Sequence, residues 1–144
     1  MADIWHSFLS VLIKLYLNCI VLLNMQREIF TITGDKSSGN VQAWIWVDHG
    51  YTIMQAPSLG LSSYGDNLEE AESMMKDVLN DFLYSLLSLK PKKRTMFLAK
   101  LGWKRSLSQK KNYSKAHIDK KGILRNLNIS KEQEKTFKEV ELAI

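Results

Sequence analysis

Apolar and polar residues alternate along four short stretches in the first half of the chain. Alternation places successive side chains on opposite faces of a sheet, so each stretch predicts a β-strand. The four stretches are residues 28–33, 41–47, 51–55 and 61–64. Residues 34–40 are rich in Gly, Ser and Asn and predict a loop, whereas Asp48-His49-Gly50 predicts a tight hairpin turn.

The period of the apolar positions changes in the middle of the chain. From 68 to 89 they recur every three or four residues, which predicts a long helix that ends before Pro91. Asn67 and Glu70 have the spacing of a capping box, and Gly65 is expected to supply a positive φ at the turn before the helix. Acidic residues in the first turns suit the positive end of the helix dipole.

Residues 136–144 alternate again and predict a closing strand. We therefore expect an α+β fold: a small antiparallel sheet of three to four strands plus this C-terminal strand, covered on one face by the long helix. Residues 25–89 with 136–144 would form the core. Trp44 and Trp46 would then lie on the face that the helix leaves open. They are expected either to pack beneath another segment of the chain or to form an exposed protein-binding surface.

Residues 1–24 form an apolar extension ahead of this core. Residues 4–23 are long enough to cross a bilayer as a helix, but Lys14 near the middle opposes insertion. Three interpretations remain open. The extension is upstream sequence before a start at Met25 rather than Met1, or a membrane-associated or amphipathic helix, or a helix of the core or of an oligomer interface.

Residues 90–135 form a basic insert between the long helix and the closing strand. Between residues 90 and 125, thirteen Lys and Arg residues are opposed by one Asp, for a net charge of +12. A short helix is expected over 95–103, ended by Gly102, followed by a polar stretch and a helix start at Ser130. Such a segment is typical either of contact with nucleic-acid phosphates or of a solvated loop. The nucleic-acid-binding candidates are Lys92, Lys93, Arg94, Lys104, Arg105, Lys110 and Lys111.

One stretch resembles a known family. The residues from Pro57 to Ala71, PSLGLSSYGDNLEEA, follow without a gap the strand-to-helix pattern of the HicB-like antitoxins. The positions that carry the motif are Pro57, Gly60, Gly65, Asp66 and Asn67. Three positions depart from the family's usual acid, polar residue and Thr: Ser58, Tyr64 and Asn67. The closing strand is similar as well, so the resemblance covers roughly residues 50–87 and the end of the chain.

The resemblance implies a partial ribonuclease H-like core and an antitoxin that neutralises a small, basic, HicA-type toxin that cleaves mRNA. It also implies a homodimer or higher oligomer and, in several members of the family, binding to operator DNA. An acidic and aromatic surface would complement a basic toxin. The toxin-binding candidates are Glu69, Glu70, Glu72, Asp77, Trp44 and Trp46. Two alternatives stay open: an orphan nucleic-acid-binding module of this family, and a membrane-tethered accessory protein.

The remaining residues argue against an enzyme. Gly60 and Gly65 lack the Lys-Ser/Thr pair of a phosphate-binding loop, and no nucleophile–histidine motif is present. The carboxylates that a metal site would need are expected at a turn, a cap and an exposed helix face: Asp48, Asp66, Glu69 and Glu70. The histidines show no ligand spacing: His6, His49 and His117. We therefore expect no metal and no cofactor, and the single Cys19 favours a reducing, cytoplasmic setting.

Overall fold

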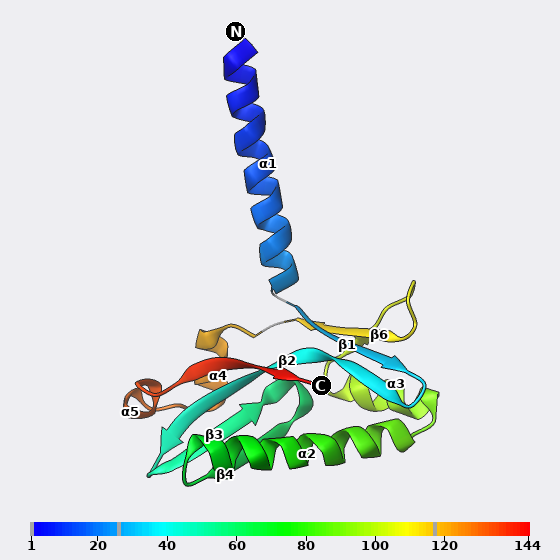
Figure 1. Cartoon of the computed structure of the whole chain (residues 1–144), viewed down its shortest axis with the longest axis vertical. Helices are drawn as coiled ribbons and strands as arrows, with labels where there is room; N and C mark the ends of the chain where they lie inside the picture. Colours follow the sequence, from blue (N-terminus) through cyan, green and yellow to red (C-terminus); the bar gives the residue numbers. More distant parts are fainter. Residues whose placement is uncertain (1, 26, 117) are drawn as a thin grey trace.

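The computed structural model describes residues 2–25, 27–116 and 118–144, so the sequence predictions for Met1 and His117 fall outside it. A curved sheet carries helices on its faces, and a long helix rises away from it (Figure 1). In chain order the elements are α1 (Ala2–Met25), β1 (Arg27–Thr33), β2 (Lys36–Asp48), β3 (Tyr51–Ala56), the 3-10 turn η1 (Pro57–Leu59), β4 (Leu61–Gly65), α2 (Leu68–Ser88), α3 (Pro91–Lys100), β5 (Lys104–Arg105), β6 (Asn112–Ala116), α4 (Lys120–Asn126), α5 (Lys131–Glu134) and β7 (Lys138–Ala143). The α+β class with an antiparallel sheet is as predicted, but the described residues form seven strands rather than the predicted four or five, because the basic insert contributes β5 and β6.

Strand β2 is the centre of the sheet. Within the described residues seven strands follow the order β4-β3-β2-β1-β6-β5, and β7 pairs with β2. Trp44 and Ile45 each pair with both β3 and β7, so these two strands lie on opposite edges of β2. Asn40 pairs in the same way with β1 and with β7. The predicted closing strand therefore completes the sheet along an edge of β2 that neither β1 nor β3 uses.

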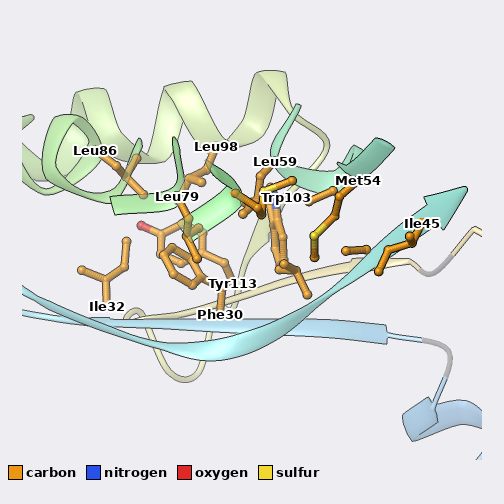
Figure 2. Close-up of a cluster of buried hydrophobic side chains, with 14 of the residues drawn as sticks. Phe30, Ile32, Ile45, Met54, Leu59, Leu79, Leu86, Leu98, Trp103 and Tyr113 are labelled. Carbon is orange, nitrogen blue, oxygen red and sulfur yellow. The ribbon is translucent and has the colours of Figure 1, made fainter. Parts of the chain in front are cut away.

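The main core lies between the sheet and helices α2 and α3. The apolar stripe of α2, which includes Met75 and Leu79, packs against side chains from β1 to β3 such as Phe30 and Met54. Figure 2 shows Leu79, Phe30 and Met54 among the side chains that meet between helix and sheet. Removing this apolar surface from water is the main contribution to the stability of the fold.

The prediction of a loop over residues 34–40 is wrong for most of this segment. Only a turn at Gly34 and Asp35 separates β1 from β2, which already begins at Lys36. Residues 36–40 pair with β1, for example Ser38 with Thr31. Pairing with a neighbouring strand satisfies the backbone and outweighs the turn-forming composition of this segment.

The strand-to-helix stretch has the predicted elements, with one correction. The side chain of Asn67 accepts a hydrogen bond from the amide of Glu70, and α2 ends at Ser88, before Pro91. The prediction of a positive φ at Gly65 is wrong, because Gly65 is not among the residues with positive φ. An added Cβ there would lie 2.5 Å from the Cβ of Glu70 and 2.6 Å from the amide nitrogen of Ala71. Glycine is needed because the strand approaches the helix closely.

The basic insert belongs to the sheet and the core. Helix α3 begins at Pro91, earlier than the predicted 95, and Gly102 with φ 92° follows its end. The stretch predicted as polar and irregular contains β5 and β6, and β6 pairs with β1. Tyr113 of β6 is buried, and its hydroxyl lies 2.9 Å from that of Thr95. Trp103 is also buried and donates a hydrogen bond to the carbonyl of Ser58.

The second face of the sheet carries a smaller core. Trp44 and Trp46 are only 2% and 7% exposed, packed with Ile123 and Phe137. Of the two alternatives predicted for these tryptophans, packing beneath another segment of the chain is therefore confirmed, and the exposed binding surface is wrong. They lie beneath the segment that contains α4 and α5, so the apolar residues of this segment serve the core.

Candidate functional site

A groove runs between helix α2 and strand β7. It has a volume of about 350 Å³ and an apolar floor that includes Met54, Leu79, Val140 and Leu142. Charged and small residues complete its lining: Glu72, Lys76, Glu141 and Ala143. The groove exists because α2 packs mainly on β4 and β3, whereas β7 lies on the far edge of β2.

Strand β7 also forms an edge of the sheet. Its pairings within the described residues are all with β2, from Ala143 opposite Asn40 to Lys138 opposite Ile45. A strand paired on one side presents unpaired N–H and C=O groups on the other, and proteins bind extended partners at such edges. The groove thus combines an apolar floor, the carboxylate of Glu72 and an available strand edge.

The acidic candidates divide between two stripes of α2. Glu72 lines the groove together with Lys76 and Leu79, at spacings of four and three residues. Glu70 and Asp77 are seven residues apart and follow a different line along the helix, where both are exposed. Glu70 has a structural role as well, because its carboxylate accepts a hydrogen bond from the amide of Asp66.

Glu69 lies in the first turn of α2 and is exposed. It does not line the groove, but it is three residues from Glu72 and therefore a neighbour on the helix surface. Of the predicted toxin-binding residues, only Glu72 belongs to the groove itself. Glu141 also lines the groove, but the alternation along β7 directs its side chain to the face opposite that of Val140 and Leu142, so Glu141 contributes no carboxylate to the groove.

The nucleic-acid-binding candidates occupy different environments. Lys92 and Lys93 are exposed in the first turn of α3, and Lys104, Arg105, Lys110 and Lys111 are exposed on β5 and the loop that follows it. Arg94 is half-buried, and its guanidinium donates hydrogen bonds to the carbonyls of Leu86, Leu87 and Leu89. The assignment of Arg94 to nucleic-acid contact is corrected accordingly: it satisfies the carbonyls at the end of α2.

A second groove, of about 220 Å³, lies beside the β5–β6 hairpin. Three cations line it, Arg27, Lys104 and Lys115, together with Gly102, Ser114 and Ala116. The lining contains no carboxylate, so the groove is suited to an anion. Sequence reasoning missed Arg27, which is 77 positions from Lys104 and is brought near it by the pairing of β1 with β6.

The motif residues of the resemblance have structural roles. Pro57 begins η1, and Gly60 ends it in the left-handed conformation at φ 66°. Gly65, Asp66 and Asn67 join β4 to α2 as described above. The carboxylates considered for metal binding do not converge, and the described residues contain no group of three His, Cys, Asp or Glu placed to hold a metal ion.

Comparison with known proteins finds no match among protein-family models, curated proteins or solved structures. Over the part of the chain that the structure describes, no helix combines the length and the apolar character that a bilayer crossing requires.

Proposed function

We propose that the protein is a HicB-like antitoxin that binds a small, basic, HicA-type ribonuclease through the groove between α2 and β7. The observation that carries this proposal is the groove itself, with an apolar floor and a rim that includes the carboxylate of Glu72, next to which Glu69 lies on the helix surface. Such an inhibitor would act in the cytoplasm, where mRNA is cleaved.

The resemblance of the motif to HicB-like antitoxins supports the same proposal. The residues of this motif build the junction from β4 to α2, and α2 forms one wall of the groove. Of the elements that the resemblance covers, β3 and β7 pair with β2, β4 pairs with β3, and α2 packs on β4 and β3. The family assignment and the groove thus concern the same part of the fold.

The proposed mechanism is steric and electrostatic. A toxin that acts on RNA carries a basic surface, so carboxylates on the rim would raise the rate of encounter. Apolar contacts with the half-buried Val140 and Leu142 would slow dissociation, since burial of apolar surface supplies most of the affinity of protein complexes. Inhibition follows if the bound antitoxin covers the surface with which the toxin holds RNA.

The test is binding of the full chain to HicA-type ribonucleases, measured by calorimetry and by protection of RNA from cleavage. Reversing the charges of Glu72 and its neighbour with Glu69→Lys and Glu72→Lys should lower the association rate, followed by stopped-flow fluorescence, about tenfold or more. The matched control reverses Asp77 and Asp81, which lie on the other stripe of α2. A chain that neither binds such a ribonuclease nor protects RNA would overturn the function. An equal loss in both double variants would overturn the location.

A further inference from the structure

Helix α1 presents a broad apolar surface to solvent. Every side chain described in it, from Asp3 to Cys19, is exposed. The largest of these apolar residues retain between 47% and 74% of their accessible surface: Ile4, Trp5, Phe8, Leu9, Leu12 and Tyr16. Apolar surface of this extent is costly in water and marks a site of contact with a protein or a membrane.

Most polar residues of α1 lie on one side of the helix, and His6 flanks them. Asp3, Ser7, Ser10, Lys14 and Asn18 recur at spacings of three and four residues, which places them on one side of the helix. Most of the remaining circumference is apolar and includes Trp and Phe. A helix of this kind lies along a membrane surface, with its polar line toward water and its apolar side among the lipid chains.

Helix α1 itself carries little positive charge. Basic residues of β1 and of the β5–β6 hairpin lie close to the end of the helix. Met25 is the last residue of α1 and Arg27 the first of β1, and Arg27 lines the basic groove with Lys104 and Lys115. Lys110 and Lys111 follow on the same hairpin. Basic residues next to an apolar helix bind the negative surface of an anionic bilayer, each contributing about a factor of five in affinity.

The loop between β5 and β6 adds an apolar contact to this basic surface. Leu107 in the loop is 98% exposed, and it stands between Arg105 and Lys110 in the sequence. Figure 1 shows this loop projecting from the sheet on the side from which α1 rises. An exposed leucine between cations has no evident use in binding phosphates of nucleic acid, whereas it can enter a bilayer surface.

We propose that α1 and the β5–β6 hairpin together bind the surface of an anionic membrane. The helix lies along the bilayer without crossing it, and the hairpin rests on the lipid head groups. A second copy of the chain paired in parallel through α1 fits this surface less well, because it would bring like-charged hairpins toward each other. The proposal does not depend on the proposed antitoxin function.

The first test is flotation of the full chain with phosphatidylcholine vesicles that contain or lack phosphatidylserine. The chain should float with the anionic vesicles and much less with the neutral ones. Lys110→Glu with Lys111→Glu should lower the affinity for anionic vesicles by more than about twenty-five-fold, the loss expected from removing two cations alone. The control, Lys131→Glu with Lys135→Glu, makes the same change in net charge on α5 and should have little effect. Equal losses in the two variants, or no flotation at all, would overturn the proposal.

The second test separates insertion of α1 from attraction to charge alone. Phe8→Asp with Leu12→Asp places two charges on the apolar side of α1 and should reduce flotation to background. Ser7→Asp with Ser10→Asp adds the same charge on the polar line and should retain most of the binding. Both pairs are exposed, so an unchanged thermal unfolding curve is expected for each. The proposal would be overturned if the chain did not bind vesicles but bound DNA or RNA through Lys110 and Lys111. It would also be overturned if the chain did not bind vesicles but dimerised in solution through Phe8 and Leu12.

Discussion

The ring of Phe137 stacks on the indole of Trp44, with ring centroids 5.1 Å apart and planes inclined by 12°. Phe137 immediately precedes β7, and Trp44 lies in β2 opposite Glu139 of that strand. Phe137 also packs on Trp46 at 5.7 Å. One aromatic side chain therefore connects the end of the basic insert to the central strand and covers both tryptophans on the second face of the sheet.

Replacing Phe137 with Ala should destabilise the protein strongly. Loss of a buried aromatic side chain leaves a cavity and costs about 3–5 kcal/mol. Urea unfolding followed by tryptophan fluorescence measures this loss, and the emission of the native state should shift to the red as Trp44 and Trp46 become hydrated. Phe97→Ala removes the same side chain from a position that is 40% exposed and should cost less. Equal losses in the two variants would contradict the role given to Phe137.

A second prediction concerns Glu28, a buried carboxylate at the junction of three segments. Its Oε1 accepts hydrogen bonds from the amide of Gln42 at 2.6 Å and from the hydroxyl of Ser58 at 3.0 Å. Glu28→Ala leaves both donors without this partner, and each such loss costs about 1–3 kcal/mol. Glu28→Gln retains an acceptor oxygen and should be less destabilising. Thermal unfolding of the two variants compares them, and an Ala variant as stable as the Gln variant would contradict this account.

Much of the fold was predictable because local patterns and tertiary contacts agree over most of the core. The spacing from Leu68 onward and the Asn67 cap specify α2, and the alternation around Trp44 specifies β2. The hairpin β5–β6 was not predictable in this way. The strand that β6 pairs with, β1, lies more than about 80 positions earlier in the chain. The buried Tyr113 stands alone between Lys111 and Lys115, so the sequence shows no apolar alternation there.

The candidate site was predictable only in part. The acidic character of α2 follows from the sequence, but the groove depends on the gap between α2 and β7, which only the order of strands around β2 determines. The same order brings Arg27 to Lys104. Conversely, Arg94 is of a residue type that often contacts nucleic acid, and it lies in the basic insert. Its guanidinium nevertheless donates to backbone carbonyls at the end of α2.

The close contact at Gly65 gives a third prediction. In Gly65→Ala the new methyl group would meet the backbone of Ala71 at the start of α2, which is not free to move. Overpacking of this kind costs about 1–3 kcal/mol or more. Gly34→Ala is the control: its φ is 62° and no atom lies within 4 Å of the added Cβ, so only the left-handed strain of about 1–2 kcal/mol applies. Asn tolerates the left-handed conformation better than Ala, so Gly34→Asn should lose even less stability than Gly34→Ala. A Gly65→Ala protein as stable as Gly34→Asn would show that the approach of strand and helix is not tight.

A fourth prediction concerns the pH dependence of Asp48 at the end of β2. Hydrogen bonding by the side chain of Gln133 lowers the pKa of Asp48 below its ordinary value of 3.8, against an opposing effect of burial, and the adjacent His49 lowers it further. Since the folded pKa lies below the unfolded one, the contribution of Asp48 to stability is present above about pH 4 and is lost as the pH falls through the folded pKa.

The variant Gln133→Glu tests this cause. It keeps the acceptor oxygen that binds the amide of Ser130, so the cap of α5 is retained. It removes the amide donor and adds a negative charge, and both changes should raise the pKa of Asp48. NMR titration of the Asp48 carboxyl carbon measures the shift, and Lys131→Gln on the same helix should leave that pKa nearly unchanged. If the pKa of Asp48 stays low in Gln133→Glu, His49 rather than Gln133 must be the group that stabilises the carboxylate.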